Sequence, residues 1–395
     1  MNIIIIGAGA AGLMAAKELS ANHQVKVLEA RDTIGGRIRT LRPGIETGAE
    51  FVHGKLPVTL GLLEKAGLSY TPIEGKMYSV DKGEWSEEEN FIEGWDELLE
   101  NMGALTQDMT LLEFLETYYA ESKYSALREE VTRYVQGFDL ANPAKVSVKY
   151  LSNEWNNEDF DNFRVDAGYH ALMEYLAGGI NVETAAVVKE INWGAGVTVT
   201  TADGQNYHGD KVIITVPLGV LQHGGLKFTP AIDDYMNAAS HIGFGSVIKI
   251  VLVFKERCWK PDTGFIFGKA KVPTWWTQSP NEEAILTGWL GGPPAEEFKQ
   301  VSEEVILKTA LDTLSEFFQR ELPELVSYHI LNWVDDPETL GSYSYDTPKT
   351  DEARKLLNTP IEQTIFFAGE ALYDGNHPGT VEAALITGID VAKKI

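Results

Sequence analysis

The chain has 395 residues with 58 acidic and 33 basic side chains, so its formal net charge is −25. Such a field repels nucleic acid and raises the local concentration of cations, although the same charge also serves solubility. The single cysteine, Cys258, excludes an internal disulfide framework and a cysteine-cluster metal site, and no apolar run approaches the roughly twenty residues that span a bilayer. No secretory signal is visible, so we expect a cytoplasmic protein of two domains that binds neither nucleic acid, membrane nor metal.

The first stretch of the chain predicts a strand, a glycine turn and a helix. Four isoleucines at 3–6 lead into Gly-Ala-Gly-Ala-Ala-Gly, and a helical pattern follows at 13–19. In this arrangement Gly7 permits a tight turn, Gly9 lets a phosphate approach the backbone, and Gly12 lets helix and strand pack closely. A helix N-terminus also attracts a pyrophosphate, so we expect a dinucleotide ligand. The alternative is that these small residues serve packing alone.

The next strand carries residues that point to a particular cofactor. It spans 24–28 and ends in Glu29, at about the spacing where a carboxylate accepts hydrogen bonds from an adenosine ribose. Glu29 begins the segment Glu-Ala-Arg-Asp-Thr-Ile-Gly-Gly-Arg, which resembles the flavin-containing amine oxidoreductases, the family of monoamine and polyamine oxidases, L-amino-acid oxidases and histone lysine demethylases. In that family the segment marks FAD rather than NAD. The resemblance implies cofactor contacts at Gly7, Gly9, Ala11, Gly12, Glu29, Arg31, Gly36 and Arg37.

A glycine-interrupted segment at 44–54 predicts a loop that passes a ligand. The resemblance places its Gly48, Ala49 and Glu50 beside the flavin ring. Polyamine oxidases of the animal type carry a histidine where His53 stands. We therefore expect His53 in the substrate pocket, where it binds the substrate or tunes the protonation of its amine; the alternative is a structural histidine held by hydrogen bonds.

The residue pattern changes in the middle of the chain. Residues 70–163 have a helical pattern, clearest at 111–119 and 125–135, which indicates an inserted substrate-binding region. A helix at 171–177 follows, and then strands rich in β-branched residues at 185–193, 197–201 and 211–216. By resemblance, Val188 lies in the strand whose backbone holds the adenine ring of FAD.

Lys249 interrupts an otherwise apolar strand at 243–254. Both faces of this strand are apolar, so the ammonium either lies at a wet end or is buried at a cost of several kcal/mol unless it is paired. A structural or snorkelling lysine is one interpretation. The resemblance implies another, in which Lys249 is catalytic and holds a water against flavin N5.

The last third of the chain carries further resemblances to the family. Trp333 resembles the tryptophan of a W-x-x-D-P segment that approaches the flavin, and Tyr343, in Gly-Ser-Tyr-Ser, resembles one aromatic wall of a cage over the flavin face. His377 stands where the second cage aromatic is usually tyrosine or tryptophan. The cage is therefore incomplete or walled by imidazole, which argues against a simple monoamine oxidase.

The C-terminal segment predicts a second helix whose N-terminus faces a bound ligand. A buried strand at 364–368 precedes Gly369 and Glu370, and a helix that begins near Thr380 and Val381 points its positive end at whatever the turn encloses. The resemblance places Glu370 at the ribityl chain or a neighbouring water, and the backbone of Thr380 and Val381 beside the pyrimidine ring. The alternative is an ordinary strand and helix that close the sheet.

Together these features predict an α/β protein with a discontinuous, Rossmann-like FAD-binding domain of the glutathione-reductase type and a second, α+β substrate-binding domain. The expected FAD-binding segments are 1–70, 165–235 and 336–395, and the substrate-binding segments are 71–164 and 236–335. The FAD is expected to be non-covalent.

The resemblance implies an FAD-dependent amine oxidase. A cationic small-molecule amine would lose a hydride to flavin N5 in its neutral form, the imine would be hydrolysed, and molecular oxygen would be reduced to hydrogen peroxide. His53 and the acidity favour a polyamine. An L-amino-acid oxidase would need an arginine such as Arg133, Arg164 or Arg257 for the carboxylate. A flavin desaturase or a protoporphyrinogen-type oxidase would lack the role of Lys249, and a non-catalytic FAD-binding protein would hold FAD that no amine reduces.

Overall fold

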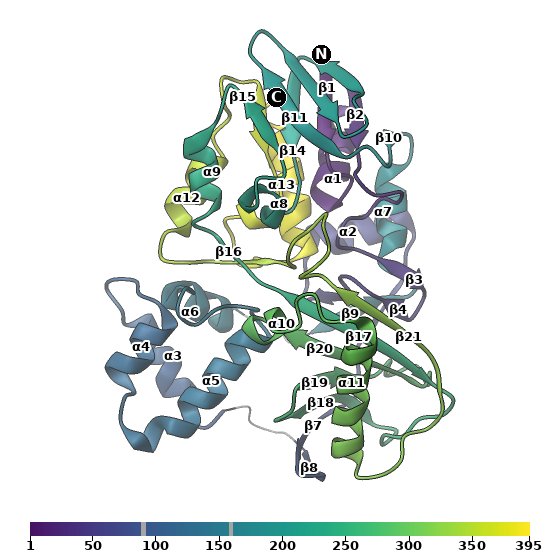
Figure 1. Ribbon diagram of the computed structural model, residues 1–395, viewed down its shortest axis with the longest axis vertical. Coiled ribbons are helices and arrows are strands. Elements are labelled where there is room, and N and C mark those ends of the chain that lie inside the picture. Colours follow the sequence, from purple (N-terminus) through teal and green to yellow (C-terminus); the bar gives the residue numbers. More distant parts are fainter. Residues whose placement is uncertain (88–91, 158–160) are drawn as a thin grey trace.

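The computed structural model describes residues 1–87, 92–157 and 161–395. In Figure 1 a five-stranded parallel sheet with its covering layers forms the upper part of the molecule, and a seven-stranded sheet and a group of helices form the lower part. This mixed α/β architecture agrees with the fold class predicted from the sequence. Within the described residues, no helix combines the length and the apolar character needed to cross a membrane.

The parallel sheet is organised around β1, the first strand. Ile3 and Ile5 pack into the core on one face and Ile4 and Ile6 into the core on the other, because successive side chains of a strand alternate between faces. All neighbouring pairs of this sheet are parallel, so the carboxyl ends of the strands share one edge. The strand order is β10 (Asn181–Glu183), β2 (Gln24–Leu28), β1 (Asn2–Ile6), β14 (Lys211–Ile214) and β23 (Ile365–Phe367).

Helices cover one face of the parallel sheet, and a second small sheet with further helices covers the other (Figure 1). The helices of the first face are α1 (Ala10–Leu19), α2 (Pro57–Ala66), α7 (His170–Ala177) and α13 (Val381–Ala392). The other face carries β13 (Asn206–Gly209), β12 (Val197–Thr201), β11 (Val188–Trp193), β15 (Lys227–Thr229), α8 (Leu218–Gln222), α9 (Asp233–Ala239) and α12 (Thr350–Leu357). Strand β11 begins later than predicted because Ala185 has a φ of 56°, which an extended strand does not allow.

The seven-stranded sheet contains the strand of Lys249. Its order is β21 (Leu325–Asn332), β17 (Val247–Phe254), β20 (Ile285–Gly291), β19 (Thr274–Trp276), β18 (Thr263–Gly268), β7 (Lys76–Asp81) and β8 (Glu84–Glu87), with α10 (Pro293–Glu296) and α11 (Glu303–Phe318) packed nearby. The single strand predicted at 243–254 is two strands, β16 (Gly243–Phe244) and β17. The break falls at Gly245, whose N–H bonds to the Tyr343 carbonyl and where a Cβ would lie 2.3 Å from Leu140 Cβ.

The prediction that 70–163 is entirely helical is wrong at both ends of the segment. Strands β7 and β8 join the seven-stranded sheet because Tyr78 and Val80 alternate with more exposed residues and bury one face. At the other end β9 (Asn162–Val165) pairs with β5 (Phe51–His53) and β6 (Tyr70–Pro72). The helices between are α3 (Trp95–Gly103), α4 (Leu111–Tyr118), a 3₁₀ turn (Ser122–Tyr124), α5 (Ser125–Gly137) and α6 (Val148–Asn156).

Short elements connect the two parts of the molecule. They are β3 (Thr40–Arg42), β4 (Ile45–Glu46), β5 (Phe51–His53), β6 (Tyr70–Pro72), β9 (Asn162–Val165), β22 (Ser344–Tyr345) and a 3₁₀ turn (Glu370–Leu372). The predicted domain boundaries at 70/71, 164/165 and 235/236 fall inside β6, β9 and α9. Hydrogen bonds link β9 to β5 and β6 across the first two of these boundaries, and the division into domains stays a prediction.

Candidate active site

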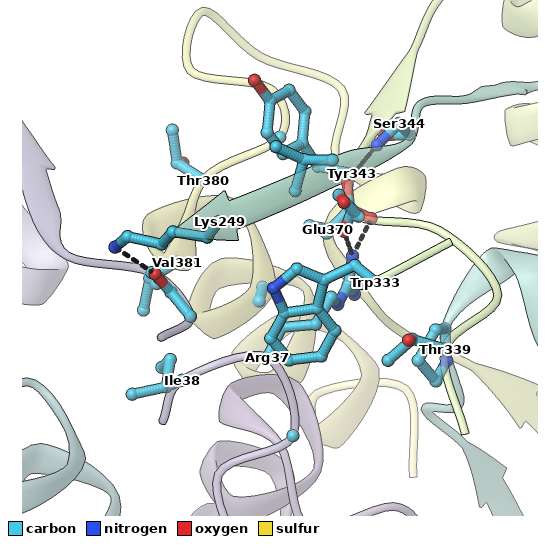
Figure 2. A pocket seen from close by; sticks show the side chains of 18 of the residues that line it. Arg37, Ile38, Lys249, Trp333, Thr339, Tyr343, Ser344, Glu370, Thr380 and Val381 are labelled. Carbon is cyan, nitrogen blue, oxygen red and sulfur yellow. Dashed lines mark hydrogen bonds and ion pairs between the residues drawn. The ribbon is translucent and has the colours of Figure 1, made fainter. Parts of the chain in front are cut away.

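A cavity of about 930 Å³ lies where the carboxyl edge of the parallel sheet meets the seven-stranded sheet and the helices α5 and α6. Figure 2 shows part of its wall, with Lys249, Trp333 and Tyr343 around the same space. Every residue that the sequence analysis assigned to the site lines this cavity except Gly12. Segments far apart in the sequence therefore meet at one place.

The glycine turn after β1 forms one end of the cavity. Gly7 has a φ of 106°, and a Cβ on Gly12 would lie 2.0 Å from the Gly7 carbonyl oxygen. Gly12 is thus needed for close packing and makes no part of the cavity wall. At Gly9 a Cβ would meet nothing closer than the Gly35 carbonyl oxygen at 4.0 Å, so this backbone stays open to a ligand. The first N–H groups of α1 lie at the same end.

Glu29 closes this end from the neighbouring strand. Its Oε2 accepts a hydrogen bond from the Ala8 N–H at 2.7 Å, and its Oε1 accepts one from the Arg31 N–H at 3.0 Å. Burial raises the pKa of Glu29, while these hydrogen bonds and the charge of Arg31 oppose the rise. Val188 lines the same cavity from the start of β11. An open glycine backbone, a helix N-terminus and an acid after the next strand fit a dinucleotide such as FAD.

The two predicted pyrophosphate cations are held by carboxylates of the chain. Arg31 Nη2 lies 2.6 Å from Asp336 Oδ1, and Arg37 Nη1 lies 2.9 Å from Glu370 Oε1. Both arginines still line the cavity. Their guanidinium groups are therefore fixed in place by partners more than 300 positions away in the sequence, which sequence reasoning did not anticipate.

Lys249 is buried and paired, so its ammonium does not lie at a wet end of the strand, and its catalytic role stays a prediction. Its side chain is 1% exposed; its Nζ donates to Glu50 Oε2 at 2.7 Å and to the Gly48 carbonyl oxygen at 3.0 Å. The Nζ also lies 5.4 Å from the centre of the Trp276 ring. Glu50 was expected to contact the cofactor, but its carboxylate is directed at Lys249 and at Arg164. Its effect on a ligand therefore passes through Lys249.

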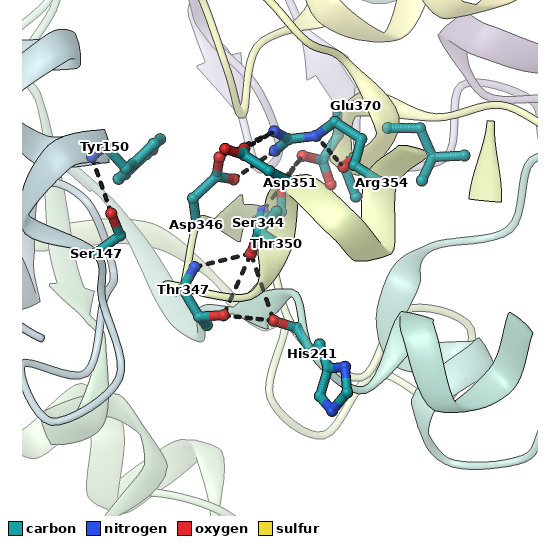
Figure 3. Close-up of polar contacts among 12 residues, drawn as sticks. Ser147, Tyr150, His241, Ser344, Asp346, Thr347, Thr350, Asp351, Arg354 and Glu370 are labelled. Carbon is teal, nitrogen blue, oxygen red and sulfur yellow. Dashed lines mark hydrogen bonds and ion pairs between the residues drawn. The ribbon is translucent and has the colours of Figure 1, made fainter. Parts of the chain in front are cut away.

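Glu370 anchors the wall beside Tyr343. Ser344 Oγ donates to Glu370 Oε2 at 2.6 Å (Figure 3), so the last serine of the Gly-Ser-Tyr-Ser segment is a site residue that sequence reasoning missed. Behind this contact Arg354 Nη1 donates to Asp346 Oδ2 at 2.9 Å, and burial raises the pKa of Asp346 although Arg354 opposes the rise. This network ties α12 to the segment that carries Ser344. Thr339 is a further cavity residue for which the sequence held no signal.

His53 faces the cavity from β5. Its Nδ1 lies 2.6 Å from Asn162 Oδ1 on β9. The ring is accessible from the cavity, yet the surrounding protein desolvates it and lowers the pKa of His53, while the contact with Asn162 opposes this. With Nδ1–H donating to the amide oxygen, Nε2 carries the lone pair. The lowered pKa favours this neutral imidazole, which can accept a hydrogen bond at Nε2.

Tyr343 and His377 both line the cavity, as expected of cage residues. The Tyr343 hydroxyl donates to the Phe138 carbonyl oxygen, which ties this wall to the end of α5. The His377 carbonyl accepts a hydrogen bond from Thr380 Oγ1 at 2.7 Å, and the same Oγ1 accepts one from the Ala383 N–H at 3.1 Å. Thr380 thus caps α13, whose N-terminus lies at the cavity.

The helical side of the cavity contains carboxylates that the sequence analysis did not select. Asp139, which follows α5, and Glu154, on α6, line it together with Tyr150 and Trp155; these four residues are the acidic end of the cavity. Desolvation raises the pKa of Tyr150 well above its ordinary value, and the charges of Glu154 and Asp139 add to the rise. The pKa of Tyr343 is raised in the same way. The acidic end therefore carries a negative potential that favours cations.

A glycine turn at the edge of a parallel sheet, joined to an enclosed cavity with a buried lysine and aromatic walls, is the arrangement of a dinucleotide-dependent oxidoreductase. A sequence model of the family described as flavin containing amine oxidoreductase matches residues 10–395. The chain therefore belongs to this family, and FAD is its cofactor.

Relatives and solved structures agree with this membership. Lysine-specific histone demethylase 2 of Homo sapiens is 29% identical over 100% of this chain and 53% of its own length. Polyamine oxidase 4 of Oryza sativa subsp. japonica is 29% identical over 99% of this chain and 88% of its own length. The chain spans about half the length of the human and mouse demethylases that it matches.

Two amine oxidase structures share the fold. Putrescine oxidase bound to putrescine has a TM-score of 0.81 at 22% identity, covering 100% of this chain and 98% of that one. Cyclohexylamine oxidase from Brevibacterium oxydans IH-35A has a TM-score of 0.83 at 21% identity, covering 99% and 98%.

Proposed function

We propose that the chain is an FAD-dependent amine oxidase whose substrate is a polyamine or diamine. The observation that carries this proposal is the acidic end of the cavity, where Asp139 and Glu154 stand among aromatic side chains. An amine with a second cationic nitrogen gains a charge-assisted contact there that a monoamine lacks. Relatives named polyamine oxidase and a fold shared with putrescine oxidase agree with it.

In this proposal the parallel sheet and its covering layers form the FAD-binding domain, and the seven-stranded sheet with α3–α6 forms the substrate-binding domain. The glycine turn and the helix N-termini of α1 and α13 would hold the cofactor, with Glu29 at its ribose. When bound, FAD supplies the acceptor for a hydride from the carbon next to the amine nitrogen. The burial of Cys258 in the core of the seven-stranded sheet, away from the cavity, supports non-covalent binding.

The chain's own residues orient the amine. The lowered pKa of His53 favours its neutral form, whose Nε2 would accept a hydrogen bond from the reacting amine without repelling it. Tyr343 and Trp333 line the same cavity and would exclude water from the bound amine. Asp139 and Glu154 would hold the distal ammonium, so the length of the substrate selects which carbon is presented.

An L-amino-acid oxidase fits less well. Two of the three candidate arginines are paired with carboxylates of the chain, and the third does not line the cavity. Arg164 is buried and bound to Glu50, and Arg257 does not line the cavity. Arg133 lines it but forms an ion pair with Glu130 of the same helix. A substrate carboxylate would also meet the negative charge of the acidic end. The cytoplasmic location remains a prediction from the sequence.

The test compares putrescine with butylamine, which has the same chain length and one amine. In Asp139→Asn and Glu154→Gln we expect kcat/KM for putrescine to fall about 10- to 100-fold, because a hydrogen bond to a charged group contributes about 1.5–3 kcal/mol. The value for butylamine should stay within about threefold. Glu324→Gln, an exposed partner of Lys255, is the control and should change neither.

Three results would count against the polyamine proposal. Equal losses for both amines would give Asp139 and Glu154 a role in folding or cofactor binding. Unchanged kinetics for putrescine in both variants would remove the distal ammonium site. Oxidation of L-amino acids in preference to amines would favour the other substrate class.

A further inference from the structure

Glu50 is shared by two buried cations. Its Oε2 accepts from Lys249 Nζ at 2.7 Å, and its Oε1 lies 3.0 Å from Arg164 Nη2 and accepts from Arg164 Nε at 3.1 Å. All three side chains are nearly inaccessible, with 1%, 3% and 9% of Lys249, Glu50 and Arg164 exposed. Three charges buried together are costly to assemble unless each is paired, so the arrangement calls for a specific role.

Arg164 is fully engaged by the chain. Besides Glu50 it donates to the Thr277 carbonyl at 3.2 Å and to the Ser279 carbonyl at 3.3 Å, and its guanidinium lies over the Phe51 ring. It therefore fixes Glu50 from behind and does not reach into the cavity, whose lining does not include it.

Lys249 differs from Arg164 because it does line the cavity. Its two hydrogen bonds, to Glu50 and to the Gly48 carbonyl, use two of the three N–H donors of an ammonium. The described residues offer no further acceptor to the third N–H. That donor is available to whatever occupies the cavity beside Lys249.

We infer that Glu50 is a positioning residue that, braced by Arg164, is the counter-ion of Lys249 and aims the remaining N–H of Lys249 into the cavity. This inference deepens the proposed function and rests on it, since it assigns the buried trio to the same site. In this role Glu50 acts through Lys249.

The surrounding charges support this assignment. Burial acts to raise the pKa of Glu50, but Lys249 and Arg164 overcome it and hold the pKa below its usual value. Glu46 is the other carboxylate near Lys249, and burial raises its pKa despite its hydrogen bonds with Tyr169 and Thr40 and the charge of Lys249. Glu46 is thus occupied elsewhere and cannot replace Glu50 as the partner of the ammonium.

Glu50→Gln keeps the size of the side chain and removes its charge. The Lys249 ammonium would then lie near the Arg164 guanidinium with no direct counter-ion, and like charge and burial both favour loss of its proton. We therefore expect Lys249 to lose its proton at a lower pH in Glu50→Gln than in the wild type.

The direct readout is NMR of the holoenzyme labelled with ¹³C at the ε carbon of lysine, with Lys249→Met identifying the Lys249 signal. In one pH titration this signal should move from the ammonium to the amine position at a lower pH in Glu50→Gln than in the wild type. The reduction potential of bound FAD depends on pH in any variant, because flavin reduction takes up protons. In Glu50→Gln this dependence should steepen where the Lys249 signal moves, and the added slope should be absent in Glu50→Gln/Lys249→Met. Neither readout requires amine turnover, so failure of the proposed substrate would be seen separately.

A Lys249 signal that behaves alike in wild type and Glu50→Gln would overturn the inference, as would an added pH dependence of the potential that survives in the double variant. If Glu50→Gln does not fold or retain FAD, Glu50→Asp decides. It keeps the charge but draws the carboxylate back, so Lys249 should remain an ammonium while kcat falls at least about tenfold with KM little changed. Unchanged kcat in Glu50→Asp would show that Glu50 does not position Lys249.

Discussion

Two parts of the cavity are built by different means. At the glycine turn the contacts are between main-chain atoms of nearby segments, such as the bridge between Gly9 and Gly35 and the approach of Gly12 to the Gly7 carbonyl. In the wall around Lys249, side chains from distant segments are paired through charge, as in Lys249 with Glu50, 199 positions apart. The glycine turn should therefore be sensitive to added volume, and the charge pairs of the cavity wall, including Arg31 with Asp336, to changed charge.

The largest effect is expected from added volume at the glycine turn. Gly12→Ala puts a Cβ 2.0 Å from the Gly7 carbonyl oxygen and 2.8 Å from Thr215 Oγ1, so helix and strand must separate. We expect a loss of about 3 kcal/mol in the free energy of unfolding and loss of bound FAD. Urea unfolding and the flavin absorbance of the purified protein measure these.

Gly61→Ala is the matched control. Gly61 lies within α2, has no positive φ, and its Cβ would meet nothing within 4 Å. Replacing it should stabilise the protein by about 0.5–1 kcal/mol, because alanine favours the helix. If both variants behaved alike, close backbone packing would not distinguish this end of the cavity.

A change of charge beside the glycine turn should have an intermediate effect, on the affinity for FAD. Asp336→Asn removes the negative partner of Arg31, whose side chain is 14% exposed, and loosens the residues that follow Asp336 along the cavity. Loss of a hydrogen bond between charged groups, at about 1.5–3 kcal/mol, predicts a 10- to 100-fold rise in the FAD dissociation constant with little change in amine KM. FAD titration of the deflavinated protein measures it.

The exposed pair of Arg42 and Glu283 supplies the comparison for that variant. Both side chains are more than 40% exposed, so Glu283→Gln should change stability by less than about 1 kcal/mol and leave FAD binding unaltered. If FAD bound Asp336→Asn as tightly as the wild type, the ion pair of Arg31 with Asp336 would not be needed for FAD binding.

The smallest effect is expected at His53, on the pH dependence of the free energy of unfolding. Its folded-state pKa lies below the ordinary value near 6.5, so the unfolded chain binds the proton more readily. The free energy of unfolding should therefore fall as the pH drops below about 6.5 and level off once the folded form is also protonated. His53→Gln should reduce this slope, which denaturant titrations between about pH 5 and 7.5 would measure. An equal slope in the variant would place the titrating group elsewhere.

The turn at Gly7, Gly9 and Gly12 and the acid at Glu29 could be recognised in the sequence because they act through local backbone geometry. Their spacing is set by one strand, one turn and one helix, and none of it depends on distant segments. The resemblance to the family rests on such short segments, and the family match over residues 10–395 bears it out.

Other parts of the site were not predictable in this way. Strands β7 and β8 were missed because short strands with few β-branched residues look like loops or helix ends until a neighbouring sheet accepts their hydrogen bonds. Asp139 and Glu154 carry no local signal, since an acid on or just after an amphipathic helix is usually solvated. Their place at the cavity follows from how α5 and α6 pack.

The amino-acid sequence by itself determined the parallel sheet with its glycine turn, the family and the cofactor, because these follow from residue types at fixed local spacing. Only the tertiary structure decided the protonation and partners of the buried groups. Whether Lys249 is wet or buried, and whether Glu50 faces a ligand or two cations, depends on segments some 110 to 200 positions apart. Charge pairing acts through space, and its energy is set by burial, which no local pattern records.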